Sequence, residues 1–234
     1  MRDSDFMKTQ ERIRDAIAQF PRLLMTTGLN ISGLVLLDLA TANGFGGEVV
    51  FVDTGYHFSE TLQLLAKLTR RYREVTFVKL AGASASDDLY KADPELCCAI
   101  NKVAPLHAYL SARKPDAILN ARTRQSASTR GSLLAIEAGN PVKVNPLLEW
   151  TQEDLELYAK VYRLDLHPLY GEGFLSMGCW PCTSAVSPGA DARSGRFVGQ
   201  ARTECGIWSN PKIGGGEPDS QDRIPLSRLA KGNL

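Results

Sequence analysis

The hydrophobic pattern of the chain consists of short apolar runs separated by longer amphipathic segments. The runs are three to six residues long, have few polar interruptions, and lie at residues 22–25, 48–52, 75–80, 117–119 and 142–147. Continuous apolar runs of this length are typical of parallel strands that are buried on both faces. Helical patterns alternate with them, beginning with the amphipathic segment at residues 8–20. The alternation predicts an α/β fold with a mostly parallel sheet and helices on both faces.

Composition narrows the class of protein. The length of 234 residues favours a single domain with a sizeable core. A net charge of +1 argues against a broad nucleic-acid-binding surface, and no apolar run approaches the roughly 20 residues that a membrane span needs. The N-terminal residues lack the apolar segment of a signal peptide, and five cysteines, an odd number, fit a reducing compartment. We therefore expect a cytoplasmic protein that binds neither nucleic acid nor membranes. The sequence leaves open whether it forms a homo-oligomer.

Polar turns follow the first two predicted strands. Their candidate binding residues are Thr26, Thr27, Gly28, Asp53, Thr54 and Gly55. In an open α/β fold, ligands bind at the carboxyl ends of the strands, where backbone N–H groups and a helix N-terminus can face an anion. The first turn lacks the Gly-Lys-Ser/Thr ending of a Walker A loop, so on its own it fits an ordinary strand–helix turn equally well.

Four of the five cysteines form two pairs. Cys97 and Cys98 are adjacent, and 80 residues separate them from the C-x-x-C pair of Cys179 and Cys182. Four thiolates from such pairs can hold a [4Fe–4S] cluster once folding brings them together. A structural zinc site is an alternative, although adjacent cysteines fit its usual spacing poorly. A third interpretation is that the first pair consists of two buried thiols.

The fifth cysteine, Cys205, stands apart from both pairs in a Glu-Cys-Gly segment. Three arginines precede it: Arg193, Arg196 and Arg202. The thiolate is the reactive form, and a cysteine of ordinary pKa is mostly protonated at neutral pH. We therefore expect the arginines to lower the pKa of the Cys205 thiol and to bind an anionic substrate. The alternative for each arginine is a solvated surface charge.

The two cysteine pairs, a lysine shortly after the first pair and the C-terminal Glu-Cys-Gly together resemble the assimilatory sulfonucleotide reductases. The resemblance runs from about residue 24 to residue 208. It implies a fold like that of the adenine-nucleotide alpha-hydrolases, a [4Fe–4S] cluster on the paired cysteines, and Cys205 as the nucleophile. The substrate-binding residues that it implies are Thr26, Thr27, Gly28, Asp53, Thr54, Gly55, Lys102, Arg122, Arg193 and Arg196. In this family the lysine, here Lys102, lies between cluster and substrate.

Three positions depart from the pattern of this family. Asn30 stands in the first turn where many members have Gly, Asn101 stands where they often have Arg, and Trp208 stands where they usually have His. Asn tolerates a positive φ better than most residues, so we expect the first turn to persist. The missing histidine removes one group that could tune the thiol of Cys205.

The resemblance implies thioredoxin-dependent reduction of adenosine 5′-phosphosulfate to sulfite and AMP, through an S-sulfonate on Cys205, in sulfate assimilation. Thioredoxin or a similar dithiol protein is the expected partner, because no further cysteine remains to act as internal reductant. Alternatives are reduction of the 3′-phosphorylated substrate, a non-catalytic nucleotide-binding module with a structural cluster, and an enzyme that activates carbonyls with ATP. We expect one reductase domain at residues 1–208 and a mobile, Gly- and Pro-rich tail at residues 209–234.

Overall fold

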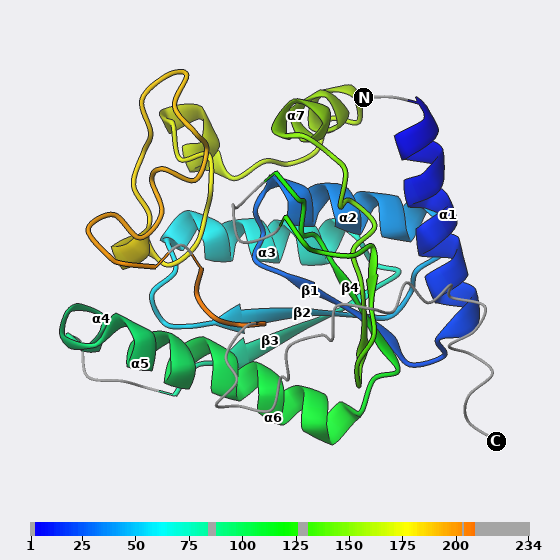
Figure 1. Ribbon diagram of the computed structural model, residues 1–234, viewed down its shortest axis with the longest axis horizontal. Coiled ribbons are helices and arrows are strands. Elements are labelled where there is room, and N and C mark those ends of the chain that lie inside the picture. Colours follow the sequence, from blue (N-terminus) through cyan, green and yellow to red (C-terminus); the bar gives the residue numbers. More distant parts are fainter. Residues whose placement is uncertain (1–2, 84–87, 126–130, 203, 209–234) are drawn as a thin grey trace.

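The computed structural model describes residues 3–83, 88–125, 131–202 and 204–208 (Figure 1). A six-stranded sheet forms its centre, with the strand order β3-β2-β1-β4-β6-β5. The strands are β1 (Leu23–Thr27), β2 (Glu48–Asp53), β3 (Thr76–Ala81), β4 (Ala117–Asn120), β5 (Ile136–Glu137) and β6 (Val142–Val144). All neighbouring strands are parallel except β5 and β6, which are antiparallel. The predicted tail lies outside the described residues.

Helices cover both faces of this sheet, as predicted (Figure 1). The longer ones are α1 (Asp3–Gln19), α2 (Ile31–Ala42), α3 (Ser59–Arg71), α6 (Ala104–Arg113) and α7 (Gln152–Val161). The shorter ones are α4 (Leu89–Ala92), α5 (Pro94–Cys98), the π-helical turn η1 (Ala99–Val103) and the 3₁₀ turns η3 (Pro168–Glu172) and η4 (Trp180–Cys182). Among the described residues, no helix is long and apolar enough to cross a membrane.

Side chains that alternate along the strands divide the core into two clusters. Met25 of β1 packs in the larger cluster with α1, α2, α3 and α7, whereas its neighbour Leu24 packs in the smaller one against Leu106 and Leu110 of α6. Successive side chains of a strand point to opposite faces, so one continuous apolar strand serves both clusters. On the face of the sheet that α6 covers, Ile207 and Trp208 also pack against the smaller cluster.

The strand order reverses between β1 and β4, which pair in parallel with Thr26 opposite Asn120. Chain connections leave this point in opposite directions, toward β2 on one side and β6 on the other. Ligands of open α/β folds bind outside the carboxyl ends of the strands at such a switch point. The two predicted turns therefore lie at the ligand-binding edge of the sheet.

The turn between β1 and α2 persists, but a different residue adopts the positive φ. Leu29 has φ +55°, whereas Asn30 is extended with φ −78°. Asn30 instead caps α2, because its side-chain Oδ1 accepts from the backbone N–H of Gly33 at 3.0 Å. The substitution of Asn for Gly in this turn is thus explained by helix capping rather than by backbone conformation.

Candidate functional site

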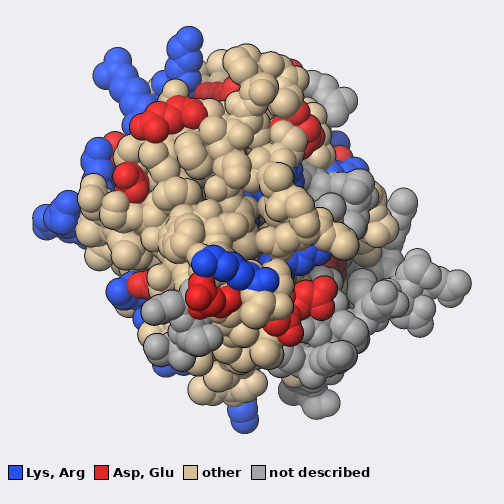
Figure 2. All heavy atoms as spheres, turned by 90° about the vertical axis from the view of Figure 1, so that its left-hand side faces the viewer, with Lys and Arg blue, Asp and Glu red and all other residues tan. Residues whose placement is uncertain are grey.

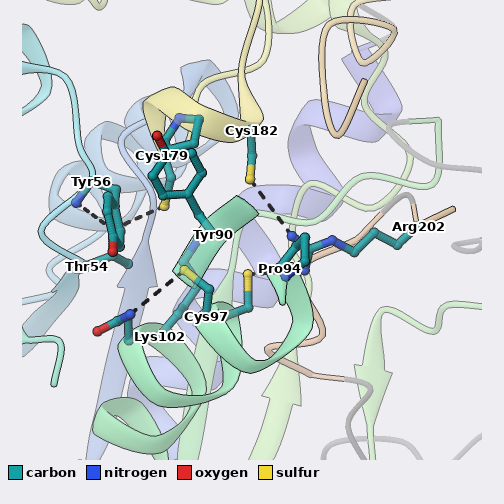
Figure 3. A pocket seen from close by; sticks show the side chains of 12 residues that line it. Thr54, Tyr56, Tyr90, Pro94, Cys97, Lys102, Cys179, Cys182 and Arg202 are labelled. Atoms are coloured by element: carbon teal, nitrogen blue, oxygen red, sulfur yellow. Dashed lines mark hydrogen bonds between the residues drawn. The ribbon is translucent and has the colours of Figure 1, made fainter. Parts of the chain in front are cut away.

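The four paired cysteines lie around one pocket (Figure 3). Cys97 and Cys98 come from the end of α5, and Cys179 and Cys182 come from either end of η4. The π-helical turn η1 follows Cys98 directly and contributes Lys102 to the same pocket. Interruptions of this type inside α-helices are frequent at functional sites. Folding therefore joins the two pairs that the sequence separates.

One cysteine of each pair has a neutral hydrogen-bonding neighbour. The hydroxyl Oγ1 of Thr54 lies 3.1 Å from the Sγ of Cys179, and the amide Nδ2 of Asn101 lies 3.9 Å from the Sγ of Cys97. The hydroxyl of Thr54 thus contacts a cysteine, and its predicted role in binding substrate stays a prediction. Donors around sulfur favour a thiolate over a neutral thiol.

The other two cysteines share a charged neighbour. The guanidinium of Arg202 donates from Nη1 to the Sγ of Cys98 at 3.3 Å and from Nη2 to the Sγ of Cys182 at 3.8 Å. The side-chain amide of Gln200 adds a donor to Cys182 at 3.9 Å. Each of the four sulfur atoms thus has at least one polar hydrogen-bonding group within contact range.

This set of donors fits a [4Fe–4S] cluster better than a single metal ion. Burial raises the pKa of the Cys97 and Cys98 thiols, so without a metal they would stay protonated at neutral pH. Within the described residues, no three Cys, His, Asp or Glu side chains converge closely enough to share one ion. In a four-iron cluster each thiolate can bind a different iron, so the sulfurs need no common point. The zinc alternative is therefore disfavoured, and cluster binding itself stays a prediction.

Lys102 carries a positive charge among these sulfur atoms (Figure 3). Burial alone lowers the pKa of its ammonium, but the surrounding Cys205, Cys179 and Cys98 raise it well above the ordinary value. Lys102 therefore stays protonated throughout the physiological range, in the lining of the pocket.

The thiol of Cys205 has the opposite shift. Burial raises its pKa, but the nearby Lys102 ammonium, the backbone N–H of Ile207 and the Arg196 guanidinium outweigh this effect and lower it below the ordinary value. The cation that we expected to favour the thiolate is thus chiefly a lysine from η1 rather than an arginine of the same segment.

His57 lies close to the same cations but is neutral. Burial and the charge of Lys102 lower the pKa of its imidazole to about 4. Its Nε2 lies 3.0 Å from the backbone oxygen of Val52, and its ring packs 4.8 Å from that of Phe51, centre to centre. This environment agrees with a structural rather than a catalytic histidine.

The predicted arginines lie in different surroundings. Arg196 donates to the backbone oxygens of Ser176 and Met177, and its Nε is buried without a hydrogen-bond partner among the described atoms. Arg193 pairs with Glu204 at 3.7 Å, directly beside Cys205. Their proximity to Cys205 is consistent with substrate binding, which stays a prediction for both.

Arg122 forms a buried network away from the cysteine pocket. Its guanidinium pairs with the carboxylate of Glu137 and donates to the Oδ1 of Asn145 at 3.2 Å. Glu137 lies in β5, so the network joins β4 to the antiparallel edge of the sheet. The carboxylate that neutralises Arg122 was not recognised in the sequence.

The turn residues at the switch point also have partners in the chain. Thr26 donates to Asn120 at 2.9 Å, and Thr27 accepts from the backbone N–H of Leu29 at 3.1 Å. Gly28 has no neighbour within 4 Å of where a Cβ would stand, so a ligand can approach its backbone. Binding of substrate by these residues remains a prediction.

Asp53 and Gly55 form the second turn. The carboxylate of Asp53 accepts from the backbone N–H of Gly55 at 3.1 Å and pairs with the ammonium of Lys79 at 3.2 Å. Gly55 needs its lack of a side chain because its φ is +76°. These contacts explain both residue types as structural requirements of the turn, whether or not they also bind substrate.

Sequence reasoning missed an aromatic group beside the pocket. The rings of Tyr56 and Tyr90 lie 5.5 Å apart, and Tyr90 lies 5.3 Å from Trp180, each edge to face. Trp180 stands inside the C-x-x-C pair, which was the available signal, and it is 45% exposed. On this side of the molecule, uncharged side chains lie among charged ones of both signs, and the described residues in view form no continuous basic band (Figure 2).

Comparison with known proteins identifies the family. Residues 22–185 match the phosphoadenosine phosphosulfate reductase domain. The chain is 55% identical to an adenosine 5′-phosphosulfate reductase of Deinococcus radiodurans, over 84% of this chain and 80% of that protein. It is 34% identical to adenosine 5′-phosphosulfate reductase 1 of Bacillus subtilis, over 80% and 84% of the two chains.

A solved structure supports the same conclusion. The phosphoadenylyl-sulfate reductase of Candida auris superposes with a TM-score of 0.66 at 26% identity, covering 76% of this chain and 90% of that one. The chain therefore belongs to the phosphoadenosine phosphosulfate reductase family. The predicted family, the fold class and the prediction that the chain is a reductase enzyme are confirmed.

Proposed function

We propose that the chain reduces adenosine 5′-phosphosulfate to sulfite and AMP, with Cys205 as the nucleophile. The observation that carries this proposal is the thiol of Cys205, which has a lowered pKa beside the buried ammonium of Lys102. The names of the relatives at 55% and 34% identity support the substrate class. The proposed role of Cys205 follows from its separation from the paired cysteines.

The reaction takes two steps. The Cys205 thiolate attacks the sulfur of the substrate, the bond between this sulfur and the bridging phosphate oxygen breaks, and AMP leaves with the electron pair. Cys205 then carries an S-sulfonate. A dithiol protein such as thioredoxin attacks the Cys205 sulfur, releases sulfite and closes its own disulfide, so that the two electrons come from its thiols.

Residues around Cys205 supply charge and position. The interaction of Lys102 with Cys205 supports a role in which its ammonium stabilises both the thiolate and the sulfate group of the substrate. Arg193 and Arg196 lie on the same segment, and planar guanidinium groups suit sulfate and phosphate oxygens. Thr26, Thr27 and Gly28 at the switch point are proposed to hold the nucleotide.

A [4Fe–4S] cluster is proposed as the resident cofactor, held by Cys97, Cys98, Cys179 and Cys182. When bound, it supplies a fixed negative charge that offsets Lys102 and ties the two cysteine pairs together. The dithiol partner supplies all the electrons that the reaction needs. We further propose that the enzyme acts in the cytoplasm in sulfate assimilation, and that residues 1–208 form the reductase domain.

The nucleophile can be tested by replacing Cys205. Cys205→Ser should keep its iron and bind the nucleotide but release no sulfite. The unchanged protein, incubated with substrate and without reductant, should gain the mass of one sulfonate on the peptide that contains Cys205. Sulfite release by Cys205→Ser at the rate of the unchanged enzyme would exclude Cys205 as the nucleophile.

The choice between the two sulfonucleotides needs its own measurement. Four paired cysteines and the names of the curated relatives favour the form without a 3′-phosphate, whereas the similar solved structure is a phosphoadenylyl-sulfate reductase. With thioredoxin as reductant, kcat/KM should be higher for adenosine 5′-phosphosulfate. A tenfold preference for the 3′-phosphorylated form, about 1.4 kcal/mol, would reverse the assignment of substrate and leave the Cys205 mechanism standing.

A further inference from the structure

Arg202 joins the two cysteine pairs through one side chain. Its guanidinium donates to the Sγ of Cys98 from Nη1 at 3.3 Å and to the Sγ of Cys182 from Nη2 at 3.8 Å. These sulfurs belong to different segments, α5 and η4, and Figure 3 shows Arg202 extending toward Cys182 from the side opposite Thr54 and Tyr56. A single planar group thus spans the pocket with two separate donors.

Two further contacts fix the direction of this guanidinium. Its Nε donates to the Oε1 of Gln200 at 2.7 Å, and its centre lies 4.8 Å above the ring of Phe197. Gln200 itself donates to Cys182 at 3.9 Å. A guanidinium held by these two contacts reaches the sulfurs with little further loss of side-chain entropy.

Arg202 precedes Cys205 by three residues, so its contacts with the cysteine sulfurs fix the chain on the N-terminal side of Cys205. On the other side, Ile207 and Trp208 pack on the smaller core cluster, and the ammonium of Lys143 lies 5.4 Å from the centre of the Trp208 ring. We call residues 200–202 and 204–208 the Cys205 segment. It is attached by an apolar contact after Cys205 and by a contact to the cysteine sulfurs before it.

We propose that Arg202 is a positioning residue that docks the Cys205 segment onto the cysteine pocket only when the pocket holds its cluster. The proposal rests on the proposed function, because it takes Cys205 as the nucleophile and the cysteines as cluster ligands. Hydrogen bonds from a guanidinium to an anionic acceptor are about twice as strong as those to a neutral one. Cysteines that hold a cluster would be anionic acceptors for the Arg202 guanidinium, so the cluster would strengthen the contacts to Cys98 and Cys182, and its loss would release the nucleophile from Lys102.

The test measures how fast Cys205 reacts with iodoacetamide under anaerobic conditions without substrate, by mass spectrometry of the peptide that contains it. In Arg202→Gln with its iron retained, we expect the rate to rise about tenfold because the segment opens more often. Removal of a cation would by itself raise the thiol pKa and slow alkylation, so a faster rate reports opening. Arg202→Lys keeps the positive charge but loses the planar guanidinium with its two separate donors, and should give an intermediate rate.

A matched control and a second variant make the result specific. Arg71→Gln removes an arginine that, like Arg202, contacts an aromatic ring but pairs with a carboxylate outside the pocket lining, and Cys205 in this variant should alkylate as in the unchanged protein. In iron-free Cys179→Ser, Cys205 should already react at the faster rate, and adding Arg202→Gln should give no further increase. Equal acceleration with and without iron would overturn the proposal.

The cluster itself provides a readout that a purely structural role would not change. Hydrogen bonds to the sulfurs help to set the reduction potential of a cluster, and a cation stabilises its more negative reduced form. Arg202→Gln should therefore lower the potential, whereas Arg71→Gln should leave it unchanged. Wild-type rate and potential in Arg202→Gln, or an anaerobic preparation without iron, would overturn the inference. Neither readout uses the sulfonucleotide, so an error in the proposed substrate would not alter these results.

Discussion

At the scale of single residues, the charge on Lys102 is the feature that links the paired cysteines to Cys205. Its ammonium is buried, yet its pKa is raised because Cys205, Cys179 and Cys98 surround it. A buried cation needs nearby negative charge to remain stable, and the thiolate of Cys205, whose pKa is lowered, can supply it. Lys102 therefore interacts both with the pocket of paired cysteines and with Cys205, the proposed nucleophile.

Replacing Lys102 should move the pH dependence of Cys205. The thiolate of Cys205 forms as the pH rises through its pKa, and Lys102 lowers that pKa. In Lys102→Met the pKa of Cys205 should rise because its main cationic neighbour is lost, so S-sulfonate formation at neutral pH should slow by roughly tenfold or more. The loss should shrink as the pH rises, because both enzymes approach full ionisation.

Single-turnover S-sulfonation measured between pH 6 and pH 10 would check this, in an enzyme whose iron content is unchanged. Lys67→Met provides a control, since Lys67 pairs with Asp165 on the surface. An unchanged pH profile in Lys102→Met would show that another group activates Cys205.

At the scale of the elements, five of the strands could be predicted to within a few residues because each is a short, continuous apolar run. β5 could not, because two residues, Ile136 and Glu137, give no periodicity. α6 was also missed, although Leu106 and Leu110 have the spacing of a buried helix face. The cysteine positions were visible in the sequence, but the contact of Arg202 with two of them depends on tertiary structure.

The Arg122–Glu137 pair is another contact that no local pattern predicts. The two residues lie 15 positions apart in the sequence. Arg122 lies in the turn after β4, and Glu137 lies on β5. Their pairing requires the antiparallel return of β5 along β6. Charge patterns in sequence report neighbours on one helix face, but they do not report pairs that a sheet brings together.

The turn between β1 and α2 gives a prediction at this scale. A Cβ on Gly33 would lie 2.6 Å from the Oγ1 of Thr27 and 3.2 Å from the Oδ1 of Asn30. Gly33→Ala should therefore displace the Asn30 cap of α2 and lower the free energy of unfolding by about 1–2 kcal/mol. It should also weaken AMP binding, because the turn that we propose holds the nucleotide is distorted.

Thermal unfolding and AMP titration of the same iron-loaded preparation would measure both effects. Gly28→Ala is the matched control for stability, since a Cβ there would meet nothing within 4 Å. Equal unfolding temperatures for the two variants would contradict the proposed role of Gly33 in the turn.

At the scale of the whole molecule, the cysteine pocket is formed by two short elements, α5 and η4, that are separate from the larger core cluster. The larger core cluster joins the sheet to α1, α2, α3 and α7 and includes none of the paired cysteines. α5 and η4 lie outside that cluster and approach each other at the pocket. The stability of the sheet should therefore depend little on the proposed [4Fe–4S] cluster. The arrangement of the cysteine pocket should depend strongly on it.

Removal of iron with a chelator under anaerobic conditions should accordingly leave the far-ultraviolet circular dichroism almost unchanged. Hydrogen exchange should become faster within residues 94–103 and 176–183, because the proposed cluster would no longer join these segments through their four buried or partly buried cysteines. Exchange within β1, β2 and β4 should stay slow, since their contacts are independent of the pocket. Loss of protection throughout the sheet would show that the cluster holds the entire fold together, and unchanged exchange near the cysteines would show that it holds neither segment in place.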